Sequence, residues 1–264
     1  CVRVFVQATG SLLDTFPGRA STTGPLAMAD WDGDGDLDLF LGGRSLPGRY
    51  PQAPESWLMH NDNGRWVQDK RNALAGAGMV SGAVFSDLDN DGDPDLVLAC
   101  DWGPVRVFRN QKGEFQEATQ ALGLDQFRGR WNGVTTGDFD GDGLMDIAAS
   151  NLGRNTPYEA WRGRGWRLIH GDLDDNGTPN LVECHWEASM GKWVPDHGLD
   201  FLAAELPLVR QSALSNQAYG PMSVEELLGD MMKRAATLEI NWLDSTVFLN
   251  RGGPFEGPPP SVQA

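Results

Sequence analysis

The chain alternates short apolar runs with polar, glycine-rich loops, and one such arrangement occurs four times. In each copy an apolar run leads into a loop dense in Asp, and a second apolar run follows directly. The runs before the loops lie at 26–29, 83–85, 133–136 and 167–169, and those after them at 37–41, 96–99, 147–149 and 181–182. Runs this short on both sides of a turn predict a strand, a loop and a second strand.

The first two copies continue into a second predicted hairpin. It comprises residues 56–60 and 65–68 in copy one, and residues 105–109 and 114–117 in copy two, with Asn and Gly in both turns. Each unit is therefore about four antiparallel strands, and a repeat of about 50 residues of this kind is typical of a β-propeller blade. The loops start at 30, 87, 138 and 172, so the third interval is too short for a complete blade.

We therefore predict an all-β fold, a single partial β-propeller of about four to five four-stranded antiparallel blades. The predicted parts are the outer hairpin of a truncated blade at 1–20, blades at 25–72 and 80–122, a short blade at 131–166, a last blade at 167–256 and a tail at 257–264. The last blade is expected to carry a helical insertion at 200–236, where Ser223 and Glu226 form a capping box, and an outer hairpin at 246–256.

The four loops share the pattern D-x-D-x-[DN]-G-x-x-[DN], which predicts a metal site in each. Side chains at positions 1, 3, 5 and 9 and the backbone carbonyl at position 7 converge on one point, and Gly at position 6 permits the tight turn. The predicted ligands are Asp30, Asp32, Asp34, Asp36 and Asp38 in loop one; Asp87, Asp89, Asp91, Asp93 and Asp95 in loop two; Asp138, Asp140, Asp142, Leu144 and Asp146 in loop three; and Asp172, Asp174, Asn176, Thr178 and Asn180 in loop four.

These oxygen-only ligand sets predict up to four structural Ca²⁺ ions. Calcium is a hard cation that accepts six to eight oxygens in flexible geometry, whereas Mg²⁺ needs a tighter octahedron and Zn²⁺ prefers nitrogen or sulfur. Without a cation the carboxylates of one loop repel one another, so binding energy becomes folding energy. Loop four has Asn at positions 5 and 9 and is expected to bind most weakly.

An EF-hand is the competing metal-binding interpretation of the same loops. It requires flanking helices and Glu at position 12, where the first three copies have Leu41, Leu98 and Ala149. Loop four has Glu183 at this position, which could contribute a ligand, but Pro179 and the strand-like flanks argue against an EF-hand helix. Strands on both sides of the loops are the favoured interpretation.

The formal net charge of −16 excludes several classes of partner. A chain this acidic is not expected to bind nucleic acid or an anionic membrane surface, both of which attract clustered Lys and Arg. The four loops alone hold 17 Asp, so the remainder of the chain is nearly neutral. No apolar run reaches the length of a transmembrane helix, and no signal peptide is visible.

The three cysteines do not form a recognisable disulfide or zinc pattern. Cys100 and Cys184 adjoin apolar runs and are predicted to be small buried hydrophobic residues. Cys1 matches the acylated first residue of a lipoprotein, but it runs without a tether into a strand-like segment, so truncation of a longer chain is the favoured interpretation.

The loops resemble the calcium loops of FG-GAP/VCBS repeats in integrin-α-like β-propellers. Further stretches, at 42–51, 131–133 and 151–156, are similar to a bacterial exported group related to the ASPIC/UnbV and cartilage-acidic-protein-like families. The resemblance implies a calcium-bound seven-bladed propeller that is extracellular, periplasmic or displayed on a cell surface, and that functions in adhesion or carbohydrate contact. The chain is too short for seven blades, so we expect it to be a fragment.

No catalytic motif is present, which favours a non-enzymatic interaction module with a protein or carbohydrate ligand. The chain lacks GxSxG, HExxH, Walker A and CxxC sequences, and its four His show no ligand spacing. The alternative is an extracellular polysaccharide-active enzyme of the lyase or dehydratase type, built on a calcium propeller. A cleft in which Lys, Tyr or His faces convergent carboxylates would favour the enzyme.

Overall fold

The structure, a computed structural model, describes residues 3–5, 12–15, 21–71, 73–161 and 164–257. It consists mainly of antiparallel β-sheets, several of them four-stranded, as expected for propeller blades. Two short strands, β1 (Arg3–Phe5) and β2 (Leu12–Thr15), pair as the predicted N-terminal hairpin. The predictions for Cys1 and for 258–264 of the tail fall outside the described residues.

The first two blades have the predicted strands in the predicted order. Blade one is the sheet β3-β4-β5-β6, and blade two contains β7, β8, β9 and β10, with β11 added beside β8. The bounds are Thr22–Ala29 (β3), Asp38–Ser45 (β4), Trp57–Asp62 (β5), Arg65–Gln68 (β6), Met79–Ser86 (β7), Asp95–Gly103 (β8), Arg106–Gln111 (β9), Glu114–Glu117 (β10) and Gly129–Arg130 (β11).

Blade three differs from the prediction in where its third strand comes from. It contains β12 (Gly133–Gly137), β13 (Asp146–Ser150) and β18 (Thr246–Phe248), and Leu249 bridges to Glu256. The prediction that 246–256 is the outer hairpin of the last blade was therefore wrong, because β18 pairs with β13. Blade three is not abbreviated but interrupted, and its outer hairpin returns about a hundred residues later.

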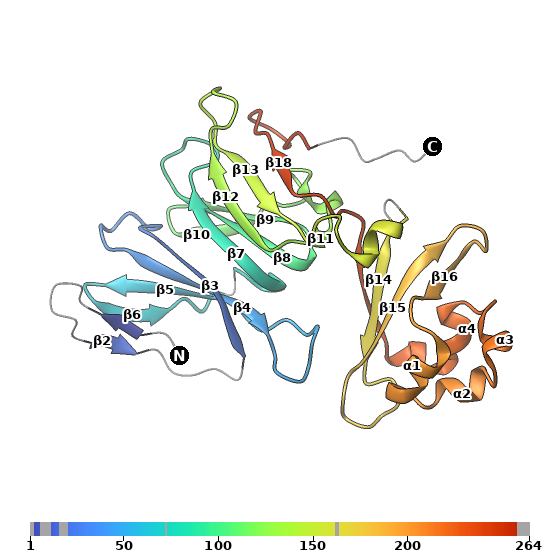
Figure 1. Cartoon of the computed structure of the whole chain (residues 1–264). Coiled ribbons are helices and arrows are strands. Elements are labelled where there is room, and N and C mark those ends of the chain that lie inside the picture. The colour runs from blue at the N-terminus through green and yellow to red at the C-terminus, as the bar shows by residue number, and fades with distance from the viewer. Residues whose placement is uncertain (1–2, 6–11, 16–20, 72, 162–163, 258–264) are drawn as a thin grey trace.

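The interruption contains a separate four-stranded sheet, which we call the inserted sheet. Its order is β16-β15-β14-β17, with β14 at Trp166–Gly171, β15 at Asn180–Glu187, β16 at Lys192–Pro195 and β17 at Ala236–Ile240. Because β17 occupies the free edge of β14, no edge of β14 remains for β18. Figure 1 shows this sheet and its helices to one side of the three blades.

The predicted helical insertion lies between β16 and β17. It comprises α1 (Leu199–Glu205), α2 (Val209–Ser212), α3 (Asn216–Tyr219), α4 (Val224–Leu228) and the 3₁₀ helix η3 (Gly229–Arg234); two further 3₁₀ turns are η1 (Leu124–Gln126) and η2 (Pro157–Trp161). The predicted capping box is confirmed, since Glu226 N donates to Ser223 Oγ at 3.1 Å and Ser223 N donates to the Glu226 carboxylate at 2.7 Å. Among the described residues, no helix has the length and hydrophobicity of a membrane span.

Aromatic and aliphatic side chains fill the contacts between successive sheets. Trp31 of loop one is buried against Phe85 and Phe115 of blade two, which joins blades one and two. A second cluster, which includes Trp131 and Phe248, joins blades two and three. The helical insertion covers one face of the inserted sheet, and the other face packs on Met79 and Trp102 of blade two.

Cys100 and Cys184 confirm the prediction that they are buried small residues. Both are free thiols with at most 1% of their surface exposed. Burial raises the pKa of each thiol to about 12. At neutral pH both remain protonated, so they are poor nucleophiles and poor metal ligands.

Candidate metal centres

The four acidic loops share one backbone conformation, which is built by the Asp at position 1. In loop one, Gly33 N and Gly35 N donate to the two oxygens of Asp30 at 2.9 and 3.0 Å. The Asp at position 1 of each other loop likewise accepts several N–H groups from residues three to five positions later. Each first carboxylate therefore closes its own turn, and the loops share their geometry as well as their sequence pattern.

This turn brings carboxylates together in loops one to three. In each of the groups Asp30–Asp32–Asp34, Asp87–Asp89–Asp91 and Asp138–Asp140–Asp146, the nearest oxygens all lie within 4.8 Å of one another. Hard oxygens converging in this way fit Ca²⁺. In loop four the amide of Asn176 instead donates to Asp174 Oδ2 at 2.9 Å, so one carboxylate oxygen is already satisfied.

The carboxylates at position 9 are buried anchors that tie each loop to its outer hairpin. Asp38, Asp95 and Asp146 are fully buried. One oxygen of each accepts the N–H of loop position 2, and the other accepts an N–H from the outer turn at 2.8 Å. The motif therefore gives position 9 a structural role in addition to the predicted role as a metal ligand.

The position 7 residues of loops one and two also reach the outer turns. Asp36 Oδ2 accepts from Asn63 N, and Asp93 Oδ2 accepts from Lys112 N, both at 2.8 Å. The loop motif predicts a role for the backbone carbonyl of this position only, as a metal ligand. Leu144 occupies it in loop three, where Asn250 Oδ1 instead accepts Gly252 N at 3.0 Å.

In blades two and three, the Asn at the start of the outer turn connects the blade to its neighbour. Asn110 of blade two donates from Nδ2 to Trp31 O of loop one at 2.7 Å and to Pro94 O at 3.2 Å. Asn250 of blade three donates in the same way to Leu88 O of loop two at 2.7 Å. The turn pattern predicts these residues only as turn formers, although the repeated Asn-x-x-Gly at 61–64, 110–113 and 250–253 is a signal for a common role.

Asn110→Ala is expected to lower the free energy of unfolding by about 2–3 kcal/mol, because a buried carbonyl of Trp31 and a partly buried carbonyl of Pro94 lose their donor. Asn61 is the matched control, since it holds the same turn position but its Nδ2 reaches only Leu37 O, at 3.2 Å and in an exposed setting. Urea denaturation of Asn61→Ala should show a loss below about 1 kcal/mol. Equal losses in the two variants would mean that the bond between blades contributes nothing.

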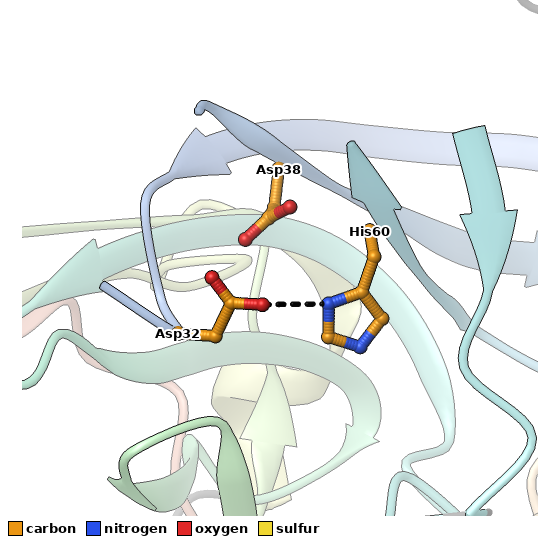
Figure 2. A group of neighbouring side chains, drawn as sticks. All are labelled: Asp32, Asp38 and His60. Atoms are coloured by element: carbon orange, nitrogen blue, oxygen red, sulfur yellow. Dashed lines mark hydrogen bonds and ion pairs between the residues drawn. The ribbon is translucent and has the colours of Figure 1, made fainter. Parts of the chain in front are cut away.

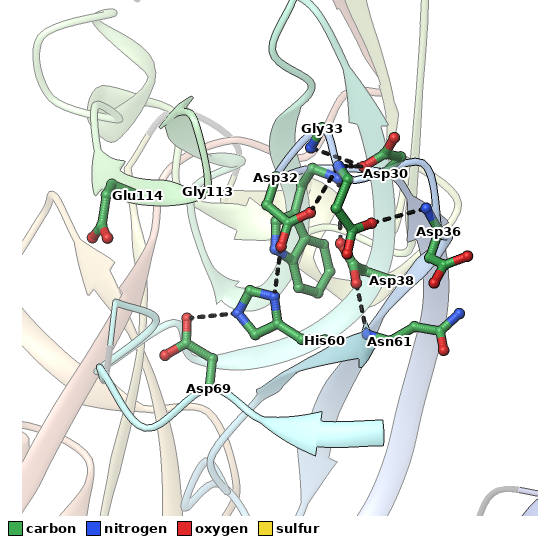
Figure 3. A network of polar contacts seen from close by, with 12 residues as sticks. Asp30, Asp32, Gly33, Asp36, Asp38, His60, Asn61, Asp69, Gly113 and Glu114 are labelled. Atoms are coloured by element: carbon green, nitrogen blue, oxygen red, sulfur yellow. Dashed lines mark hydrogen bonds and ion pairs between the residues drawn. The ribbon is translucent and has the colours of Figure 1, made fainter. Parts of the chain in front are cut away.

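A cationic or imidazole side chain lies against the carboxylates of each of the first three loops. His60 Nδ1 lies 3.1 Å from Asp32 Oδ2, Arg109 Nη1 lies 3.2 Å from Asp89 Oδ2, and Arg251 Nη1 lies 2.9 Å from Asp142 Oδ2. Figure 2 shows the imidazole of His60 beside Asp32 and Asp38, and Figure 3 shows Asp69 on the far side of the same ring. These three residues lie outside the loop motif, so the sequence did not predict their place beside the loops.

The pKa of Asp38 shows that burial and neighbouring carboxylates disfavour its charged form in loop one. Burial, and to a lesser extent the charge of Asp32, raise the pKa of Asp38 to about 6, although backbone N–H groups oppose the shift. Burial also raises the pKa of the Asp95 carboxyl group in loop two, although the hydrogen bond from Asn110 N and the charge of Arg109 oppose this shift. A cation in either loop would offset this penalty.

Position 9 of loop four contacts the helical insertion, whereas position 9 of the other loops contacts an outer hairpin. Asn180 Oδ1 accepts Leu173 N at 3.0 Å, and its Nδ2 lies 3.5 Å from Glu205 O at the end of α1. A carboxylate at position 9 would repel that carbonyl, which gives a physical reason for Asn. Glu183, considered above as a further ligand of loop four, instead accepts from Tyr158 Oη at 3.1 Å and lies near Asp196 and His197.

Comparison with known families supports the repeat assignment. The family model of the FG-GAP-like repeat matches residues 30–98 and 87–149. The matched segments begin at the acidic loops of blades one and two and extend through β13 of blade three. No curated protein matches the chain. Residues 30–149 thus carry FG-GAP-like repeats, in agreement with the antiparallel blades.

Proposed function

We propose that the chain is a calcium-stabilised propeller module in which the acidic loops bind structural Ca²⁺ ions. The observation that carries this proposal is the convergence of three loop carboxylates within 4.8 Å in each of loops one to three. Loop four is the weakest of the four sites, because Asn176 replaces a charged ligand and already donates to Asp174. The ions fix the hairpins of the blades rather than take part in a reaction.

Calcium has to compete with side chains that already neutralise part of each loop. A guanidinium can balance one charge, but it cannot supply the six to eight coordination positions that orient a whole loop. Arg251 also pairs with Glu256 at 3.3 Å, so it has another acceptor when a metal takes Asp140 and Asp142. We therefore expect calcium to displace Arg251 in loop three with little loss of ion pairing.

Saturating Ca²⁺ is expected to raise the melting temperature by at least about 5 °C over the protein in excess EDTA, because the ion binds the folded loops and not the unfolded chain. Differential scanning calorimetry of the same sample before and after chelation measures this shift. Mg²⁺ at the same concentration serves as the ionic-strength control and should give a smaller shift. Identical midpoints with calcium and with EDTA would refute the calcium role.

A variant in one loop tests whether the loops bind calcium independently of one another. Asp89→Ala removes one carboxylate of the loop-two group. Titration calorimetry should then show weakened binding at one site while the remaining sites keep their affinity. Loss of all binding would show instead that the loops act as one cooperative unit.

The biological role that fits these properties is interaction with a protein or carbohydrate ligand outside the cytoplasm, without catalysis. Support comes from the FG-GAP-like repeats and from the absence of a catalytic motif in the sequence. The stretches at 42–51, 131–133 and 151–156 extend the proposal to a relation with ASPIC/UnbV-type exported proteins. Repeats of this kind provide a rigid scaffold whose exposed loops contact other molecules.

A further inference from the structure

A mixed cluster of carboxylates and imidazole lies outside the four acidic loops, on the inserted sheet. Glu183 lies in β15, and Asp196 and His197 directly follow β16. One ligand atom from each of the three residues lies within 4.8 Å of the other two. Asp196 N donates to Glu183 O at 2.9 Å, so backbone pairing holds the two acidic residues side by side.

Neighbouring groups fix the orientation of these side chains. Tyr158 Oη donates to Glu183 Oε1 at 3.1 Å. The ring of His197 stacks on Phe201 of α1, with centroids 4.3 Å apart and planes at 23°. The hydroxyl of Tyr219 donates to the carbonyl oxygen of His197. Hydrogen bonds and packing of this kind are what holds ligands in position around a bound metal.

A second imidazole lies on the same face. His185 is two residues beyond Glu183 in β15, so the two side chains point the same way. Its Nδ1 lies 3.4 Å from Asp196 Oδ1, and its ring packs on Trp166. The cluster therefore offers two carboxylates and two imidazole rings.

The positive groups beside the two carboxylates are the imidazoles and, one hydrogen bond further away, Arg130, which interacts with Tyr158. In the ion pairs of the described residues, neither Glu183 nor Asp196 is joined to Lys or Arg. This contrasts with loops two and three, where Arg109 and Arg251 contact the acids. Two adjacent carboxylates without such a partner favour a cation between them.

We propose that Glu183, Asp196, His197 and His185 form a site for a divalent transition metal of the zinc class. Carboxylate and imidazole together are the ligands that Zn²⁺ prefers, whereas Ca²⁺ takes oxygen alone. A tetrahedral zinc with bonds of about 2.1 Å separates its ligand atoms by about 3.4 Å, so modest movement of Glu183, Asp196 and His197 closes this group around the ion. His185 approaches the site from the side of Asp196 and is the fourth ligand. The metal joins β15 to the segment that enters α1 and so fastens the helical insertion to the inserted sheet.

The site is tested by zinc titration calorimetry and Co²⁺ absorption spectra on the whole chain, with the acidic loops saturated with Ca²⁺. The wild-type chain is expected to bind one Zn²⁺, and His197→Gln or Asp196→Asn to raise its Kd by at least about 100-fold. Tyr158→Phe, which removes the hydrogen bond to Glu183, should raise the Kd by about 10-fold. His170→Gln, a change on β14 outside the cluster, is the matched control and should leave the Kd unchanged.

Two outcomes would overturn the assignment. One is a Kd that is the same in the wild-type chain and in His197→Gln and Asp196→Asn. The other is loss of zinc binding in His60→Gln, which would place the ion at the Asp32–Asp38–His60 group instead. Melting temperatures in EDTA show whether each variant folds; Asn matches Asp in size and can still hydrogen-bond to His185, so Asp196→Asn should leave the metal-free midpoint nearly unchanged.

Discussion

Replacing Asp95 by Ala is expected to lower the free energy of unfolding by about 3–5 kcal/mol, even in excess EDTA. Asp95 is fully buried and accepts Leu88 N at 3.1 Å and Asn110 N at 2.8 Å. It also pairs with Arg109, which is only 20% exposed. Alanine leaves two buried N–H groups without acceptors and a largely buried guanidinium without its main partner.

Urea denaturation with and without EDTA separates the anchoring role of Asp95 from its role as a predicted calcium ligand. A carboxylate that acts only as a ligand contributes nothing once calcium is removed, whereas an anchor contributes under both conditions. Asp93→Ala is the matched control, because Asp93 accepts only Lys112 N from the outer turn and should cost about 1 kcal/mol in EDTA. A negligible loss for Asp95→Ala in EDTA would contradict the anchoring role.

The blades and loops could be predicted from the sequence because their signals are local. An apolar run, a loop with Gly at position 6 and a second apolar run specify a hairpin without reference to the rest of the chain. Blades one and two were therefore predicted with nearly the observed strands. The capping box at Ser223 was also correct, because it depends on residues only three positions apart.

The partner of β18 could not be predicted, because strand pairing across a long insertion depends on which sheet edge is open. The segment 246–256 has the local pattern of an outer hairpin, and that pattern is compatible with blade three or with the preceding sheet. The deciding fact is that β17 already covers the free edge of β14. Edge availability is a property of the whole fold, and no local pattern encodes it.

The anchoring role of position 9 could not be predicted from the sequence, because it too depends on contacts between segments distant in the chain. An Asp there matches a calcium ligand in the loop pattern, and the sequence does not show that its oxygens face the N–H groups of an outer turn 23 residues away in loop one. The exception at Asn180 was visible in the sequence but was interpreted only as lower metal affinity. The nearby carbonyl of Glu205 gives it a structural reason.

Gly82→Ala is expected to lower the free energy of unfolding by about 3 kcal/mol, because β7 and β12 approach too closely for a side chain at this position. A Cβ atom on Gly82 would lie 2.8 Å from Gly133 Cα and 2.9 Å from Val134 N. These are backbone atoms of the next blade, so no rotamer change can relieve the overlap. The only response is to move blade three away from blade two, which opens the buried cluster around Trp131.

Gly103→Ala is the matched control for this contact, since Gly103 lies at the end of the neighbouring strand β8 and also has no positive φ. The nearest atom to its added Cβ is the Cys100 side chain at 3.4 Å, so the change should shift stability by less than about 1 kcal/mol. Chemical denaturation of both variants in saturating calcium gives the comparison. If Gly82→Ala were as stable as Gly103→Ala, blades two and three could not pack as closely as described, and the bond from Asn250 to loop two would lose its structural basis.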